Sequence, residues 1–253
     1  MKKIAFWSYK GGTGRTLTLC NTAVELMRMG KNVGIIDLDW EAPGVPLLFK
    51  LDPEFIEKRP SLTDLIIHRV IGILSKAVHE VTGLVSNPPL RGRLYILPTI
   101  NSPELDNIKF DDDTFIFLNA IFDNFIQVYM LDYLLIDTRT GFSVTSGLAA
   151  NFADATFICL RLDRQNVSGV EKAIKGFKIN GAKFHLIFSN VPKIKGAEAK
   201  IAEVEEKLGA KGEVMLGLVP ELILDENLYS LSNPEHELSK SYKKIADIIV
   251  SKK

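Results

Sequence analysis

Seven short, continuously apolar runs recur along the chain, and segments with helical spacing separate them. Continuous rather than alternating apolar character is typical of strands that are buried on both faces, as in a parallel sheet. Strand, helix and strand repeated in this order predict an α/β fold, namely an open, doubly wound and mostly parallel sheet with helices on both faces. The runs are residues 4–7, 33–36, 94–97, 133–136, 156–160, 184–188 and 214–218.

Residues 50–92 are predicted to form a helical insertion within a single domain that spans residues 1–253. Helical spacing favours helices at 61–68 and 70–85, and Asn87-Pro88-Pro89 is typical of a loop. The insertion has too little apolar sequence for a core of its own. A chain of 253 residues with 46% hydrophobic and 25% charged residues suits one large α/β domain.

The last predicted helix covers residues 237–251 and carries one apolar face. We expect this face to cover one side of the sheet, although the lysines around it leave a membrane-binding helix as an alternative. Asp111-Asp112-Asp113 is interpreted as a helix N-terminus, where acidic residues are favoured, and calcium binding is the weaker alternative. The apolar residues of the last helix are Leu238, Tyr242, Ile245, Ile248 and Ile249.

Charge and cysteine content limit the classes of function. Lysine plus arginine equals aspartate plus glutamate at 31 each. This balance argues against wholesale coating of nucleic acid, although a local basic patch is compatible with it. Cys20 and Cys159 form no CxxC pair, so we expect no iron–sulfur cluster or other cysteine-ligated metal within one chain. Few cysteines, an N-terminal apolar run that stops at Ser8 and the lack of any membrane-length apolar stretch predict a cytoplasmic protein.

Ligands of open parallel sheets bind beyond the carboxyl ends of the strands, and a glycine-rich loop follows the first run. The loop reads Lys10-Gly11-Gly12-Thr13-Gly14-Arg15-Thr16, and a helix is predicted over residues 16–29. Glycines let successive N–H groups point at a phosphate, and the helix N-terminus adds its positive end. The Arg15 side chain would then face the β- and γ-phosphates, and the Thr16 hydroxyl would hold Mg²⁺.

The loop departs from the common GxxxxGK[ST] pattern. Tyr9 stands where the first glycine would be, and Arg15 replaces the lysine. The alternative is a glycine-rich turn that binds no ligand. Against it, the loop stands between a predicted strand and a predicted helix, as a phosphate-binding loop does.

Acidic residues follow two further runs. The second run ends in Asp37-Leu38-Asp39, and the fourth ends in Asp137-Thr138-Arg139-Thr140-Gly141. An apolar strand that closes on an aspartate is a Walker B pattern, and its carboxylate would reach the magnesium shell. The Gly141 N–H could serve a γ-phosphate. Each aspartate alone could equally be a helix cap, but the three elements appear in the order that phosphate binding requires.

The loop resembles the deviant Walker A signature, KGGxG[KR][ST], of the ParA/MinD ATPases within the SIMIBI class of P-loop NTPases. Asp37-Leu-Asp-Trp-Glu-Ala-Pro-Gly is similar to the switch I region of that superfamily. The branch with a GGxGRT loop, a DxDxEAPG stretch and a D[ST]RTG Walker B is especially similar. Arg15 is typical of this branch, and the resemblance covers almost the whole chain.

This resemblance implies ATP or ADP with Mg²⁺ as cofactors. It makes Lys10 the signature lysine, which reaches across an ATP-bound dimer to the phosphates of the partner. Arg15 takes the place of the P-loop lysine. Thr16 would ligate Mg²⁺ directly, with Asp37 and Asp137 in the outer shell of the metal.

The resemblance also implies roles at the two ends of the nucleotide. Asp39 matches the aspartate that orients the attacking water, and Leu17 is grouped with the loop as a nucleotide contact. Asn190 matches the residue that reads adenine, and Val219-Pro220-Glu221 matches the segment along the base. An Asn and a Pro at strand ends are also common in ordinary turns, which is the alternative for the adenine residues.

Other polar residues show weaker patterns. The histidines have no ligand spacing and are interpreted as surface or core residues. Three arginines fall near strand ends, where they could contact phosphate, a dimer partner or only solvent. The histidines are His68, His79, His185 and His236, and the arginines are Arg139, Arg161 and Arg164.

The function expected from these features is an ATP-dependent dimeric switch with slow ATPase activity, working in regulation, positioning or partner recruitment. We expect a homodimer and a protein partner, whereas binding of nucleic acid or membrane is compatible but not indicated. One alternative is an ATP-dependent metabolic ligase or small-molecule kinase on the same fold, with a substrate pocket opposite the γ-phosphate that residues 50–92 build. The other is a nucleotide sensor or scaffold that does not hydrolyse ATP.

Overall fold

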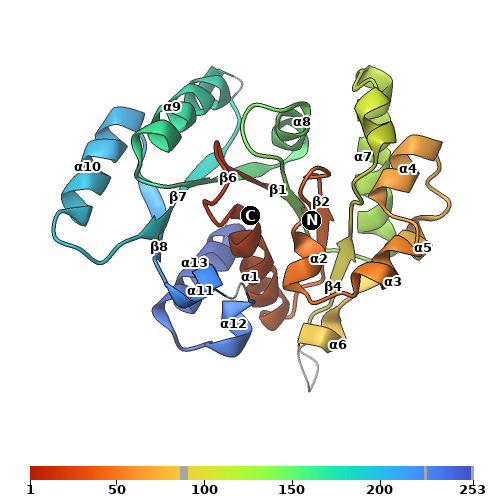
Figure 1. Ribbon diagram of the computed structural model, residues 1–253, viewed down its shortest axis with the longest axis horizontal. Coiled ribbons are helices and arrows are strands. Elements are labelled where there is room, and N and C mark those ends of the chain that lie inside the picture. The colour runs from red at the N-terminus through yellow and green to blue at the C-terminus, as the bar shows by residue number, and fades with distance from the viewer. Residues whose placement is uncertain (86–90, 180, 225–226, 252–253) are drawn as a thin grey trace.

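The computed structural model describes residues 1–85, 91–179, 181–224 and 227–251, and its strands form one eight-stranded sheet (Figure 1). The strand order is β3-β4-β2-β5-β1-β6-β7-β8. All pairs are parallel except β3 with β4. The strands are β1 Lys2–Trp7, β2 Val33–Asp37, β3 His79–Glu80, β4 Leu94–Leu97, β5 Tyr133–Asp137, β6 Ala155–Leu160, β7 Phe184–Val191 and β8 Gly212–Gly217.

Helices cover both faces of the sheet, which confirms the predicted doubly wound α/β fold (Figure 1). One face packs against α1 Arg15–Arg28, α2 Val45–Leu48, α6 Thr82–Val85, α12 Tyr229–Ser232 and α13 Glu237–Ser251. The other packs against α4 Leu62–His68, α5 Leu74–Ala77, α7 Asp112–Val128, α8 Val144–Phe152, α9 Arg164–Ile179 and α10 Ala197–Leu208. The remaining short helices are α3 Pro53–Glu57, the 3-10 helix η1 Pro103–Asn107 and α11 Glu221–Leu224.

The apolar runs form strands because each of their faces has a core to enter. Successive side chains of a strand point to opposite faces. In β2, Ile35 belongs to the core under α1, and its neighbour Ile36 belongs to the core under α7. All seven predicted runs are strands in the structure, and every residue of β2, β4 and β5 is buried.

The helix predicted over residues 70–85 is wrong. The segment divides into α5, the short strand β3 and α6, and β3 pairs antiparallel with β4 through His79 and Ile96. Gly72 and Gly83 weaken a continuous helix, and Val78 is extended with φ −82° and ψ 135°. The two glycines and the pairing of β3 with β4 therefore account for the break between α5 and α6. The predicted loop at 87–89 lies outside the described residues.

Other predicted helices agree closely with the structure. Ser61 caps α4 in a capping box with Asp64, and Asp111 caps α7 through Thr114 N–H. The predicted last helix is α13, and its apolar face lies in the core against α1, as expected. No helix in the described residues is long and apolar enough to cross a membrane.

Candidate nucleotide site

The glycine-rich loop connects β1 to α1 at the carboxyl edge of the sheet. Gly12 and Gly14 have φ values of 71° and 72°, in the left-handed region that glycine adopts without strain. Gly14 is also the N-cap of α1, and no side chain caps that end. The first N–H groups of α1 are therefore available to an anion.

The ends of β2 and β5 bring carboxylates to the start of α1. Asp37 and Asp137 are direct neighbours in the sheet. The Thr16 hydroxyl donates to Asp137 Oδ2 at 2.7 Å. Asp39 is also buried next to this group, through its ion pair with Arg15. The structure thus gathers Thr16, Asp37, Asp39 and Asp137, which the sequence predicted to share one site.

Arg15 binds to two of these carboxylates, Asp137 and Asp39, and it also lines the adjoining cavity. Its Nε lies 2.7 Å from Asp137 Oδ1, and its Nη2 lies 3.1 Å from Asp39 Oδ2. Nη2 also donates to Thr16 Oγ1 at 3.2 Å. The Arg15 side chain is 6% exposed, and its Nη1 is buried without a hydrogen-bond partner. One guanidinium therefore compensates the charge of the buried Asp137 in part and is shared with the partly exposed Asp39.

The pKa values of the cluster follow from burial and from neighbouring charges. Burial raises the pKa of Asp37 to about 8, with Asp137 as the second cause. Three N–H groups, from Asp39, Gly44 and Val45, donate to Asp37 and favour its ionised form, so they limit the rise. Burial alone would lower the pKa of Arg15, but Asp137 and Asp39 outweigh burial and raise it. Arg15 is therefore charged at any pH of interest.

The donor set fits Mg²⁺. Magnesium prefers oxygen ligands and is usually bound by one or two carboxylates together with water and substrate phosphates. Thr16 Oγ1 and Asp137 Oδ2, 2.7 Å apart, offer such oxygens beside a phosphate loop. Among the described residues, no group of three or more His, Cys, Asp or Glu side chains has the geometry of a metal site. A site that shares its metal with phosphates does not need one.

Two hydrogen bonds hold the loop after β5 against β1. The Gly141 N–H donates to Ser8 O at 2.9 Å, and the Trp7 indole Nε1–H donates to Gly141 O at 2.9 Å. The sequence predicted that the Gly141 N–H could serve a γ-phosphate. In this structure the group is already bonded, so that role would require the loop to move.

Tyr9 has a packing role that its position in the loop did not suggest. Its ring lies against α9, where a Cβ on Gly169 would come within 2.1 Å of Tyr9 Cδ1. The ring also meets Phe142 edge-on at 5.8 Å. The absence of a side chain at Gly169 therefore allows the Tyr9 ring of the loop to pack against α9.

Lys10 lies on the exposed side of the loop, and its Nζ donates to Gln165 Oε1 of α9. Glu41, within the switch-like stretch, forms an ion pair with Arg139. Both contacts lie on the surface around the loop. The role of Lys10 across a dimer stays a prediction.

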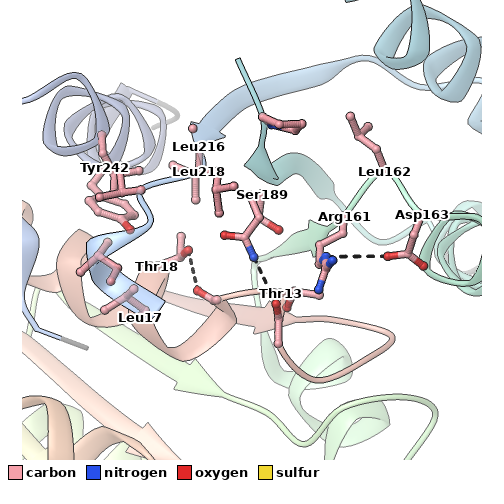
Figure 2. Close-up of a pocket in the computed structure, with 18 residues that line it drawn as sticks. Thr13, Leu17, Thr18, Arg161, Leu162, Asp163, Ser189, Leu216, Leu218 and Tyr242 are labelled. Carbon is pink, nitrogen blue, oxygen red and sulfur yellow. Dashed lines mark hydrogen bonds and ion pairs between the residues drawn. The ribbon is translucent and has the colours of Figure 1, made fainter. Parts of the chain in front are cut away.

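Two cavities adjoin the loop. A cavity of about 400 Å³ is lined by the loop, Asp39, Glu41, Gly44 and Arg139. A cavity of about 670 Å³ extends from Gly12 and Leu17 to the ends of β7 and β8 (Figure 2). Phosphates suit the smaller cavity, with its polar rim, and a nucleoside suits the larger one.

The residues expected at the base line the larger cavity only in part. Asn190 lines it, has a φ of 53° and donates to Gly12 O at 3.2 Å. Val219 also lines it, whereas Pro220 is exposed and Glu221 begins α11. Arg161 and Asp163 stand at 3.8 Å from each other on the wall formed by the end of β6.

Sequence reasoning missed the wall contributed by α13. Leu238 and Tyr242 line the cavity, although they lie more than 200 residues from the loop (Figure 2). Their helix has an ordinary amphipathic pattern, so the sequence carries no signal that distinguishes these two residues.

The described histidines and cysteines line neither of the two cavities at the glycine-rich loop. His79 and His185 are buried, and His185 contacts Glu213, while His68 and His236 are exposed. Cys20 and Cys159 are buried free thiols of the core, and burial raises the pKa of Cys159 to about 12. The expected absence of an iron–sulfur cluster stays a prediction.

Comparisons with known proteins agree with this geometry. Residues 1–79 match a family model described as ParA, NUBPL iron-transfer P-loop NTPase. The septum site-determining protein MinD of Helicobacter pylori is 22% identical over 260 residues, which cover 96% of this chain and 88% of that protein. The match to the family model rests on the segment that contains the phosphate loop and the DxDxEAPG stretch.

Two solved structures show the same fold. MinD of Pyrococcus horikoshii complexed with Mg-ADP has a TM-score of 0.73 and 19% identity, covering 98% of this chain and 95% of that one. A putative plasmid partition protein of Borrelia burgdorferi bound to AMPPNP has a TM-score of 0.76 and 18% identity, covering 100% and 99%. These two structures confirm the fold that the sequence motifs predicted.

Proposed function

From a fold of the ParA/MinD-type P-loop NTPases, we propose that this chain is a single-domain ATP-dependent switch. It binds ATP with Mg²⁺, hydrolyses it slowly and forms a dimer while ATP is bound. The observation that carries the proposal is the convergence of Thr16, Asp37, Asp39, Asp137 and Arg15 beside the glycine loop. Related folds with Mg-ADP and AMPPNP support the choice of ligand.

The proposed division of labour follows from position. Thr16 would ligate Mg²⁺ directly, with Asp37 and Asp137 in its outer shell, and the metal would neutralise phosphate charge when bound. The Asp37 carboxylate accepts the Gly44 and Val45 N–H groups, both at 3.2 Å. It therefore also fixes the start of α2. A change at the metal site would alter the backbone conformation of residues 39–45.

Arg15 has two sets of partners in this proposal. Without nucleotide its fork binds Asp137 and Asp39. With nucleotide it turns to the phosphates, because a guanidinium fork matches phosphate oxygens in pairs. The exchange frees Asp39 to orient water for in-line attack, so hydrolysis would be suppressed until a triphosphate has drawn Arg15 away.

Lys10 of one subunit is proposed to contact the phosphates of the nucleotide that the other subunit binds. Its side chain leaves the loop on the exposed side, toward Gln165. A cation at that place contributes most by stabilising phosphate charge across an interface. Phe142 and Val144, which are 64% and 52% exposed, lie in the segment that follows Gly141 and would be covered by a second subunit.

The biological setting is proposed in coarser terms. We place the protein in the cytoplasm and assign its dimer a protein partner of regulation or positioning. MinD occurs in a solved complex with MinC, which shows that proteins of this fold dock partners. No contact in the described residues favours DNA or membrane as the target.

Binding is tested by calorimetry with Thr16→Ala and the conservative control Thr16→Ser. Loss of the hydroxyl should weaken Mg-ATP much more than ATP in EDTA, and serine should restore binding. Equal affinity of wild type and Thr16→Ala for Mg-ATP would overturn the assignment of the metal site.

Light scattering and phosphate release with Lys10→Ala and Asp39→Ala test the switch. Lys10→Ala should lose both the ATP-dependent dimer and turnover, with nucleotide binding nearly intact. Asp39→Ala should stop turnover and leave an ATP-bound dimer. A wild type that stays monomeric and releases no phosphate would favour the sensor alternative, and turnover by a monomer that tolerates Lys10→Ala would favour the metabolic enzyme.

A further inference from the structure

The larger cavity contains a polar side chain that the proposed phosphate chemistry does not use. Tyr242 of α13 lines the cavity and is 2% exposed. Within the described part of the chain, its hydroxyl forms no hydrogen bond with protein. Figure 2 shows the ring with its hydroxyl end toward Leu17 and Thr18. The hydroxyl oxygen is not one of the buried polar atoms that lack a partner in the described residues, so it is accessible from the cavity that Tyr242 lines.

The neighbouring polar groups are already committed to protein partners. The Thr18 hydroxyl donates to Gly14 O at 2.7 Å, and the Ser189 hydroxyl donates to Leu160 O at 3.2 Å. Of Thr18, Ser189 and Tyr242, only Tyr242 has a hydroxyl proton that remains available to a ligand. A phenol can donate one hydrogen bond and accept another.

The shape and composition of the cavity suit a flat, mostly apolar ligand. Its volume is about 670 Å³, and Leu17, Leu216, Leu218 and Val219 contribute apolar walls. Small-molecule sites combine such walls with a few placed polar groups. The cavity begins at Gly12 of the phosphate loop, so whatever fills it is continuous with a group bound at that loop.

Charge excludes a second phosphate group from the inner end. Arg161 stands on the opposite wall and is paired with Asp163, and neither Leu17 nor Thr18, toward which the Tyr242 hydroxyl points, carries a charge. Burial also raises the pKa of Tyr242, so the hydroxyl keeps its proton at neutral pH. A neutral ring with hydrogen-bonding edge atoms is the chemistry that this end recognises.

We propose that Tyr242 hydrogen-bonds the purine base of the bound nucleotide, so that the C-terminal helix forms the base-reading wall of the site. This inference rests on the proposed nucleotide-binding function and adds a residue that contacts the base. It also gives α13 a part in binding, because a base held by Tyr242 joins α13 to α1 and to the phosphate loop.

The test compares Mg-ATP with Mg-tripolyphosphate, which has the phosphates but no base. Calorimetry on Tyr242→Phe should show Mg-ATP binding weakened roughly three- to tenfold, the loss of one hydrogen bond. Binding of tripolyphosphate should stay within about twofold of wild type, because the loop is unchanged. Tyr133→Phe is the matched control, since Tyr133 begins β5 and therefore lies at the amino-terminal end of this strand, away from the loop at the carboxyl ends.

The same variant separates a base contact from a structural role. The hydroxyl has no protein partner, so its removal should leave the melting temperature of the nucleotide-free protein unchanged or higher. ATP should then stabilise Tyr242→Phe less than it stabilises wild type.

Two results would overturn the inference while leaving the proposed function in place. One is equal affinity of wild type and Tyr242→Phe for Mg-ATP, and the other is an equal loss for ATP and tripolyphosphate. A wild type that binds neither ligand would overturn the proposed function, and the base contact with it.

Discussion

Replacing Arg15 by glutamine should destabilise the protein strongly when neither nucleotide nor metal is present. Arg15 is 6% exposed, and its partners Asp137 and Asp39 are 0% and 12% exposed. Removing one partner of a buried ion pair costs about 3–5 kcal/mol, because the remaining charge is left uncompensated. Arg15 Nη1 is itself unpaired, at a cost of roughly 1–3 kcal/mol that glutamine does not carry. We therefore expect the lower end, about 3 kcal/mol.

The measurement is urea unfolding in EDTA and again with Mg²⁺ alone. In the wild type, Arg15 already neutralises Asp137, so Mg²⁺ alone should stabilise little. In Arg15→Gln the carboxylates are free to bind the ion, which contributes about 2.7 kcal/mol when its concentration is 100 times its dissociation constant. Arg161→Gln is the control, because its side chain is 50% exposed and its loss should change stability by about 0.5 kcal/mol or less.

Two outcomes would refute this reasoning. A loss of less than about 1 kcal/mol for Arg15→Gln would mean that the pair is not the compensated buried cluster described above. Equal stabilisation of wild type and variant by Mg²⁺ would mean that Arg15 does not compete with the metal. The stability of Arg15→Lys should lie between that of the wild type and that of Arg15→Gln. A lysine retains the charge but cannot bind both carboxylates with one planar group.

Two further predictions concern pH and packing. Because burial, with Asp137 as the second cause, raises the pKa of Asp37 from 3.8 to about 8, the folded state holds this proton more tightly than the unfolded chain. Stability in EDTA should thus fall as the pH rises between those values, by up to about 1.4 kcal/mol per unit, and equal slopes for wild type and Asp37→Asn would contradict this. Gly169→Ala should cost about 1–3 kcal/mol of unfolding free energy, because the new Cβ would lie 2.1 Å from the Tyr9 ring. Gly176→Ala in the same helix meets nothing within 4 Å and should stabilise by up to about 1 kcal/mol, so equal effects would argue against the Tyr9 contact.

Much of the fold could be read from the sequence because its strands are buried on both faces. Such strands are continuous apolar runs, and all seven runs became strands of the sheet. The eighth strand, β3, was missed because it is only two residues long and its pairing with β4 is what defines it. A pairing partner is a tertiary property, and residues 79–80 carry no period that reveals it.

The candidate site divides in the same way. The sequence alone determined the glycine-rich loop between a strand and a helix, the order of the elements and the edge at which Asp37 and Asp137 meet, because the carboxyl ends of parallel strands lie together. Tertiary structure alone decided that Arg15 pairs with Asp137, 122 residues away, and that Tyr242 of the last helix lines the cavity at the loop. A short sequence motif determines only the local backbone conformation. Contacts across the chain depend on how whole helices pack, so neither the compensation of buried charge nor the wall of a cavity appears in any short segment.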